Sequence, residues 1–307
     1  MVMPFQLRPS KITLVGVDGS LWHLSGTDQG AEGVELAIAP SGAFDAPVST
    51  IWNATAFQTG ATWYGMRYDK RDLVLSFNVS AAGGLSWETV DGKFRNAWSY
   101  TTDATLIVTT ETSTRCLHLR LSQHPDFSPK HDPHLKSWAP IVLTCTAGFP
   151  FWIEQDITQT WASSIDTTSG AHEQEGSIEG ENPTDLPMYL EWVCSAPAQW
   201  TLPDFSFGLD YNYGSGSGAA NIARVVTLPQ TVAGQDLTIN TNPELPMIIS
   251  ADGSNLWAAM NGVSFLYPVP PKTPPTTFPV WVTYAPAGAS VMLVQNRFWT
   301  RPWGLQP

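Results

Sequence analysis

The chain has 307 residues, a length that fits about two domains with cores of their own. Only 14% of its residues are charged, against a usual value of about 25%. Asp and Glu outnumber Lys and Arg by 27 to 15, and the formal net charge of −12 argues against electrostatic binding to nucleic acid or to anionic membranes. So few charges beside 14 Trp and 25 Pro indicate either a surface covered by a partner subunit or ligand, or an aromatic-rich core.

The cysteines and the N-terminus bear on the compartment. Cys116, Cys145 and Cys194 form no CxxC or metal-ligand spacing, so we expect free thiols in a reducing cytoplasm. Residues 1–11 contain no apolar segment followed by a small-residue cleavage site, and no run approaches about 18 apolar residues. We therefore expect neither a signal peptide nor a membrane span.

Short runs of β-branched and aromatic residues, separated by Gly, Pro, Asn and Asp, predict antiparallel strands in the first half. The first, Lys11–Val17, ends in the hairpin-turn pair Asp18-Gly19, so Leu21–Leu24 can pair back onto it. The further strands expected are Val34–Ala39, Thr50–Phe57, Thr62–Tyr68, Asp72–Val79, Ala104–Thr110, Arg115–Leu121 and Ser137–Cys145.

One segment, Ser86–Ser99, has helical periodicity instead. Its apolar residues recur at the spacing of one helix face, namely Trp87, Val90, Phe94, Ala97 and Trp98. Ser86 can cap the N-terminus, and Glu88 in the first turn suits the helix dipole. We expect one amphipathic helix that packs on a sheet.

Residues 122–136 form a segment rich in His and Pro. Together with His118, its His124, His131 and His134 are the one histidine cluster to consider for a metal. Pro125, Pro129 and Pro133 should keep the segment out of a helix, so no two histidines share a helical face. We expect a turn-rich surface loop and name no metal ligand.

The second half begins at GFPFW, residues 148–152, which predicts a domain boundary near residue 150 and hence domains 1–150 and 151–307. The acidic stretch 172–185 should be a solvated hairpin or loop, and residues 207–220 a flexible Gly/Ser-rich segment. Pro268–Pro279 predicts a rigid polyproline crossover at a sheet edge, with an SH3-type ligand as the alternative. The strands expected are Ile153–Trp161, Leu190–Cys194, Arg224–Leu228, Leu237–Asn240, Val280–Tyr284 and Ser290–Val294.

Catalytic motifs fail on spacing. His172-Glu173 opens an HExxH pattern whose last position is Gly176, and glycines 214–218 fit neither GxSxG nor a phosphate loop. A glycosidase pair is defined by a spatial separation of about 5 to 9 Å, and its candidates are Glu154, Asp156, Glu191 and Asp204. We name no catalytic and no cofactor-binding residue.

Tryptophans of the second domain are the residue type that stacks on sugars in lectin-like sandwiches, although their strand-like context also fits core packing. We keep three as candidate contacts to a sugar or a protein partner: Trp161, Trp192 and Trp200.

The order of segments in Arg224–Trp303 is a Thr-Ile-Asn-Thr strand, a DGSNLW turn, a Val-Pro-Pro, two more strands and a closing Arg-Pro-Trp. That order resembles the C-terminal domain of siphophage distal tail proteins. Similar to the ring domain of the same family are Ile12–Leu24, Gly33-Val34, Gly42, Asp45-Ala46-Pro47 and Gln58-Thr59-Gly60. The helix Ser86–Ser99, followed by strands 104–110 and 115–121, is similar too. The resemblance therefore covers most of the chain.

The resemblance implies a mainly β fold: a ring-forming β-sandwich with one α-helix, then a galectin-like or carbohydrate-binding-module-like β-sandwich. It implies a structural virion protein without catalysis or cofactor, of the kind called a minor tail protein in phages of actinobacteria. Assembled in the host cytoplasm, its homohexameric ring at the virion tail tip would join the major tail protein of the tube to the tail-associated hub protein.

Further partners that the resemblance implies are the tape-measure protein, receptor-binding proteins and host glycans. Phage DNA would pass through the lumen without specific binding, which suits an acidic chain. The alternative is a carbohydrate-binding adhesin that contacts the host envelope. The acidic stretch 172–185 has no place in the resemblance.

Overall fold

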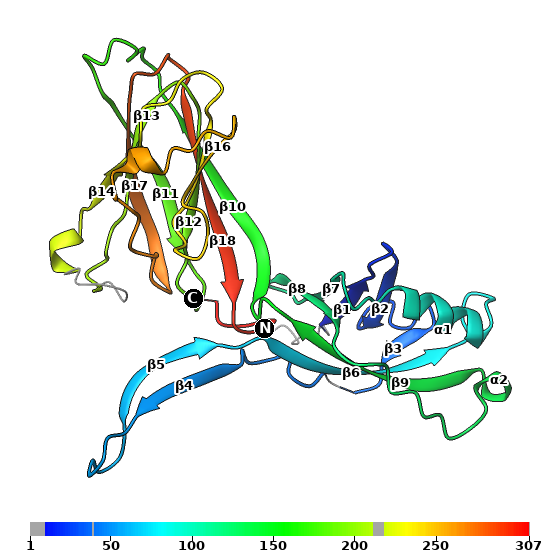
Figure 1. Cartoon of the computed structure of the whole chain (residues 1–307). Helices are drawn as coiled ribbons and strands as arrows, with labels where there is room; N and C mark the ends of the chain where they lie inside the picture. Colours follow the sequence, from blue (N-terminus) through cyan, green and yellow to red (C-terminus); the bar gives the residue numbers. More distant parts are fainter. Residues whose placement is uncertain (1–9, 39, 211–217, 307) are drawn as a thin grey trace, which may run out of the picture. The chain divides into compact units, whose positions relative to one another are not determined.

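A computed structural model describes residues 10–38, 40–210 and 218–306. The fold is mainly β, with several antiparallel sheets and few short helices. It divides into unit 1, Met1–Glu154 with Trp299–Gly304, and unit 2, Gln155–Phe298 with Leu305–Pro307. Strand β10 (Trp152–Ala162) leads the chain from unit 1 into unit 2, and β18 (Ser290–Trp299) leads it back (Figure 1).

Unit 1 is built on antiparallel strands that meet at β8. One side has the order β2-β1-β7-β8, and the other has β3-β6-β9-β8. The long strand β6 alternates cleanly, with Leu73, Leu75, Phe77 and Val79 buried. The bounds are β1 Lys11–Val15, β2 Leu21–Ser25, β3 Val34–Leu36, β6 Arg71–Ser80, β7 Ala104–Thr109, β8 Thr114–Leu121 and β9 Trp138–Ala147. These strands confirm the predicted ones; Ala39, the last residue of one prediction, lies outside the described residues.

The predicted helix is present as α1, Trp87–Asn96. Ser86 caps it by accepting a hydrogen bond from the Thr89 backbone N–H. The ring of Phe94 lies edge-on to Phe77 and Trp22, with centroids 5.0 and 5.1 Å away. Complete burial of a side chain of this size contributes about 1.5–3 kcal/mol, so the apolar face holds the helix on the sheet.

The prediction of a single helix was wrong, because the His/Pro-rich segment contains a one-turn helix, α2, at Pro133–Lys136. Pro133 stands in the first turn, where a missing N–H costs nothing. Asp132 caps the turn by accepting from the His134 N–H at 2.9 Å, and Ser137 ends it in the left-handed region. Proline therefore starts this turn and does not prevent it.

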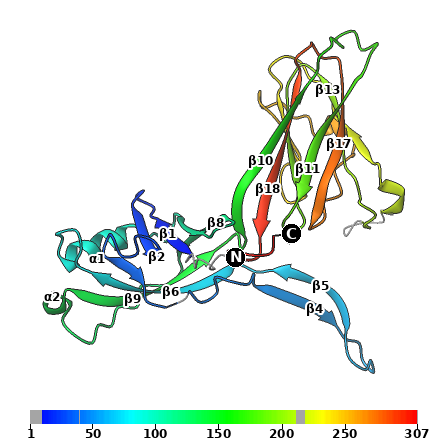
Figure 2. The same ribbon diagram turned by 180° about the vertical axis from the view of Figure 1, so that it is seen from behind.

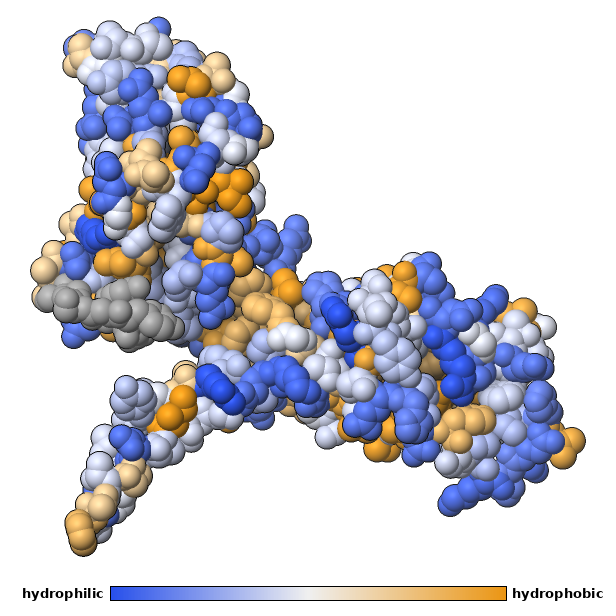
Figure 3. Space-filling model, viewed as in Figure 1, coloured by the Kyte–Doolittle hydropathy of each residue, from blue (hydrophilic) through white to orange (hydrophobic). Residues whose placement is uncertain are grey.

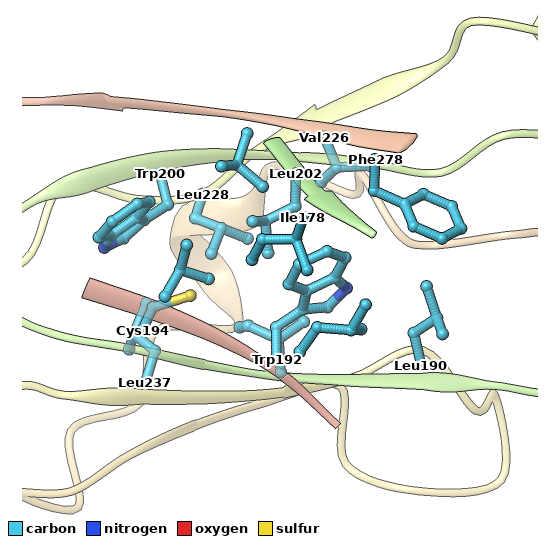
Figure 4. Packing of buried hydrophobic residues seen from close by; sticks show 14 of the residues in the cluster. Ile178, Leu190, Trp192, Cys194, Trp200, Leu202, Val226, Leu228, Leu237 and Phe278 are labelled. Carbon is cyan, nitrogen blue, oxygen red and sulfur yellow. The ribbon is translucent and has the colours of Figure 1, made fainter. Parts of the chain in front are cut away.

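Unit 2 is a sandwich of two antiparallel sheets, β16-β15-β12-β18-β10 and β11-β17-β13-β14. Figure 4 shows Trp192 and Cys194 facing Trp200 and Leu202 across its core. The bounds are β11 Gln174–Asn182, β12 Leu190–Cys194, β13 Gln199–Pro203, β14 Val225–Thr227, β15 Leu237–Asn240, β16 Ile248–Ser250, β17 Thr273–Thr283, and the single 3-10 turns Ala219–Asn221 and Ala258–Met260. Strands β13 and β16 were not predicted. Of the Gly/Ser-rich segment, residues 211–217 lie outside the described part.

The acidic stretch 172–185 is not the solvated hairpin or loop that was expected, because most of it is strand β11, which pairs along its length with the sequence-distant strand β17. Its glutamates Glu175 and Glu179 face outward, while Ile178 and Gly180 face the core. Gly180 is required there, since a Cβ would lie 2.6 Å from the ring of Phe278. The many charged residues on the outer face of this strand made its buried face hard to recognise in the sequence.

The proline-rich segment also forms a strand, so the predicted crossover over Pro268–Pro279 was wrong from Thr273 onward. Strand β17 pairs with β11 from its first residue, but β13 joins its other side only from Trp281. Pro274, Pro275 and Pro279 thus lie where the strand has one neighbour, which is where a sheet tolerates a missing N–H. Among the described residues, no helix is long and apolar enough to cross a membrane.

Candidate functional site

An exposed hairpin of unit 1 is the candidate site, and we call it the arm. It consists of β4 (Val48–Asn53) and β5 (Thr62–Tyr68), which pair with each other and with no other described strand. Figures 1 and 2 show it extending from the other strands of unit 1. A lone two-stranded hairpin is marginally stable in water, so an arm of this kind gains from a cover.

Large apolar side chains line the arm on both of its faces. Trp52 is 57% exposed, its cross-strand partner Trp63 58% and Tyr64 77%. Ile51 and Met66 are also exposed, and Figure 3 shows apolar residues along the arm. Exposed aromatic clusters of this kind mark protein interaction surfaces.

The tip of the arm holds Phe57 entirely in solvent. Its backbone has a φ of 69°, unusual for a residue with a side chain. The neighbouring Gln58 side chain fixes this turn: its Oε1 accepts from the Thr55 N–H at 3.1 Å, and its Nε2 donates to Thr62 Oγ1 at 2.9 Å. Phe57 is therefore presented by an ordered turn.

The base of the arm is held by Arg71, the first residue of β6, which lies three residues after the end of the arm and is 1% exposed. Its guanidinium donates to the carbonyls of Ala43 at 2.9 Å, Pro150 at 2.7 Å and Thr300 at 2.9 Å, and also to those of Gly42 and Asp45. Burial lowers the pKa of Arg71 to about 10. One side chain thus fixes the segment before β4, the start of β6 and residue 300.

A second buried arginine, Arg115, fixes the rest of residues 299–304. Its guanidinium lies 3.7 Å from the ring centroid of Trp299 and donates to the carbonyls of Arg301 and Gly304. The Trp299 indole donates to Glu154 Oε2 at 2.5 Å. The segment Trp299–Gly304 is therefore a built part of unit 1.

The three tryptophans singled out from the sequence all lie in unit 2. Trp192 and Trp200 are fully buried in its core. Trp161 is half-buried, packs over Gly176 and lies edge-on to Trp200 at 6.2 Å. Trp161 is therefore the one of the three that a ligand could touch.

Sequence reasoning missed the aromatic residues of the arm. A signal was present: strands Thr50–Phe57 and Thr62–Tyr68 carry apolar residues at both odd and even positions. Such strands are either buried on both faces within their own chain or become covered by a partner protein, and the sequence pattern alone does not distinguish the two cases.

The candidate carboxylates are engaged in structural contacts. Asp204 is buried, paired with Arg224, and accepts from the backbone N–H groups of Leu266 and Tyr267. Burial raises the pKa of Asp156. Within the described ranges, no three His, Cys, Asp or Glu side chains are placed to hold a metal, and the three cysteines are free.

No model of a known protein family matches the chain. It is 29% identical over 342 residues to the minor tail protein Gp27 of Mycobacterium phage L5, covering 96% of this chain and 98% of that protein. The minor tail protein Gp27 of Mycobacterium phage D29 is 28% identical with the same coverage.

Among solved structures, the Dit protein (gp 19.1) of phage SPP1 superposes with a TM-score of 0.59 at 12% identity, covering 94% of this chain and 98% of that one. These findings confirm the resemblance predicted from the sequence. The chain is similar along nearly its whole length to the minor tail protein Gp27 of mycobacteriophages, and it has the fold of the distal tail protein Dit of SPP1.

Proposed function

We propose that the chain is a structural subunit of a phage tail tip, a distal tail protein that joins the tail tube to the central hub without catalysis or cofactor. Its relatives are named minor tail proteins, and its fold is that of a protein described as a paradigm of the hub adsorption apparatus. The observation that carries the proposal is the arm, an ordered hairpin whose aromatic side chains are left exposed by the described part of the chain.

Assembly follows from the geometry of the arm. A projecting apolar hairpin that binds a different surface on a second copy makes a head-to-tail contact, and repeated contacts of this kind form a ring when the rotation between copies closes. We infer a homohexamer in which residues 1–150, with Trp299–Gly304 packed into the same unit, form the ring, and the rest of residues 151–307 forms an outer, galectin-like sandwich. Its partners would be the tube, hub and tape-measure proteins, with receptor-binding proteins on the outer domain.

The net charge suits a ring around a DNA path. With 27 acidic and 15 basic residues, the chain has a net charge of −12 that repels phosphate. DNA would therefore pass through the lumen without adhering. The location would be the tail tip of the virion.

Native mass spectrometry with negative-stain imaging of the full chain tests this function. Six copies of 33.5 kDa, about 200 kDa, seen as rings with a central hole are expected. Replacing Trp52 and Trp63 by Ser should give monomers, because the apolar surface of the arm is lost. The control Ile222→Ser removes an equally exposed apolar side chain of unit 2 and should leave rings intact. Equal assembly of arm variant and parent would contradict the role of the arm.

A carbohydrate-binding adhesin is the second candidate, and half-buried Trp161 is the observation in its favour. A glycan array of the full chain against Trp161→Ala decides this case. Binding lost in the variant would support an adhesin, whereas no binding by the parent leaves the structural role alone.

A further inference from the structure

A pocket of about 420 Å³ lies in unit 1 between the His/Pro-rich segment and strand β9. Two lysines and one histidine of the segment line it together with apolar rings. The lining residues used below are Pro129, Lys130, His131, Lys136, Trp138 and Pro140. The volume is in the range of ordinary ligand sites.

The pocket is built on a fixed frame. Phe127 stacks on Trp87 of α1 with centroids 6.0 Å apart, and His134 lies edge-on to the same ring at 5.4 Å. Asp126 and Val142 exchange two backbone hydrogen bonds, of 2.9 and 3.0 Å, which fasten the segment to β9. These contacts hold in place the backbone that carries the lining, which lowers the entropy cost of binding.

Charge distinguishes this pocket from the rest of the surface. In the described part of the chain, nearly every Lys and Arg makes an ion pair or a hydrogen bond to the protein, for example Lys70 with Asp72 and Arg120 with Asp103. The exceptions there are Lys93, Lys130 and Lys136, and the last two line the pocket. In a chain with such an excess of carboxylates, two lysines without a partner in one pocket are unexpected.

The two acids of the segment serve the local fold. Asp126 accepts from Ser128 Oγ at 3.0 Å, and Asp132 caps α2. Neither comes within ion-pair distance of the lysines. The positive charge of the pocket is therefore available to an anion from outside.

We propose that this pocket binds an acidic segment of a partner protein. Carboxylates of the segment would meet Lys130 and Lys136, and an apolar or proline side chain between them would pack on Trp138, Pro129 and Pro140. Charge complementarity selects an anionic ligand, and the apolar walls favour a polypeptide over a small ion. The proposal rests on the proposed function only in taking the partner to be another tail protein.

The test uses the full chain and a fluorescently labelled peptide in which Glu and Pro alternate around one Phe, followed by anisotropy at low salt. Binding should weaken about tenfold or more in the double variant Lys130→Gln, Lys136→Gln, because both counter-charges are removed. Lys93→Gln is the matched control: it removes an exposed lysine that also lacks a partner but lies outside the pocket, and it should leave binding unchanged. The peptide with Gln in place of Glu should not bind.

Several outcomes would overturn the proposal: no binding of the Glu peptide to the parent, equal weakening by Lys93→Gln, or unchanged binding in the double variant. Displacement of the peptide by an equal concentration of inorganic phosphate would mark a simple anion site instead. Native mass of the same samples separates the two proposals. Rings without peptide binding reject only the pocket, and peptide binding without rings rejects only the ring.

Discussion

Arg71 shows how much one side chain holds at the base of the arm. Its five acceptors are backbone carbonyls, so Arg71→Met leaves buried carbonyls unpaired and should lower the free energy of unfolding by about 3 kcal/mol or more. Urea denaturation of the full chain measures it. Arg301→Gln is the comparison, because the pair of Arg301 with Asp45 is exposed and should be worth no more than about 1 kcal/mol. A similar loss of unfolding free energy in both variants would contradict the role of Arg71 in holding the base of the arm.

No sequence pattern predicts the structural role of Arg71, because its carbonyl partners lie at residues 42–45, 150 and 300 and come together only in the folded unit. The same limit applies to Trp192 and Trp200, which as residue types fit a sugar face as well as a core. The sequence identifies candidate side chains, but only their burial shows whether they pack in the core or contact a ligand. Burial depends on the tertiary structure.

At the scale of one element, α1 gives a prediction in the stabilising direction. Gly92 is in the middle of the helix, and a Cβ added there meets no atom within 4 Å. Gly92→Ala should therefore raise the free energy of unfolding by about 0.5–1 kcal/mol, through the lower entropy of the unfolded chain. Ser86→Ala, which removes the N-cap, should lower it by about 1 kcal/mol. A thermal melt of each variant checks both signs, and a destabilising Gly92→Ala would show that the glycine serves a contact made on assembly.

A second element-scale prediction concerns strand β11. A Cβ at Gly180 would lie 2.6 Å from the Phe278 ring and 3.2 Å from a Leu293 methyl, so Gly180→Ala forces core side chains to shift. The expected cost is about 1–3 kcal/mol in denaturant unfolding. Gly65→Ala in the arm, where no atom lies within 4 Å, is the control and should change stability little. A neutral Gly180→Ala would mean that this sheet is more loosely packed than the contacts indicate.

Elements with a clear period were predictable, and elements whose signal is divided were not. Helix α1 and strand β6 show one apolar face each and were found from the sequence. In strand β11, two residues that face the core stand between glutamates in the sequence. Strand β17 includes three prolines, which a strand tolerates where it has a neighbour on one side only. Whether a strand has one neighbour or two depends on the sheet and is absent from the local sequence.

At the scale of the whole molecule, the positions of the exposed aromatic residues bear on why the chain has so few charges. Four of the exposed aromatic residues lie together in the arm, which pairs with no other described strand: Trp52, Phe57, Trp63 and Tyr64. The resemblance to distal tail proteins could be seen from the order of segments along the whole chain, because that order survives where identity is low. The surface that carries the assembly role could not, because an arm and an interior hairpin share one pattern.

The arm is structurally separable, so its removal should abolish assembly and spare the fold. Val48 and Tyr68 are register partners at the root, and a short Gly turn joining them in place of residues 49–67 keeps the Tyr68–Phe151 ring contact and all bonds of Arg71. We expect the melting temperature to fall by only a few degrees, because the arm contributes no side chain to the core. Native mass should show a monomer where the parent forms rings. Rings in the shortened chain would place the assembly contact elsewhere in the chain, and a chain that no longer folds would show that the arm supports its own unit.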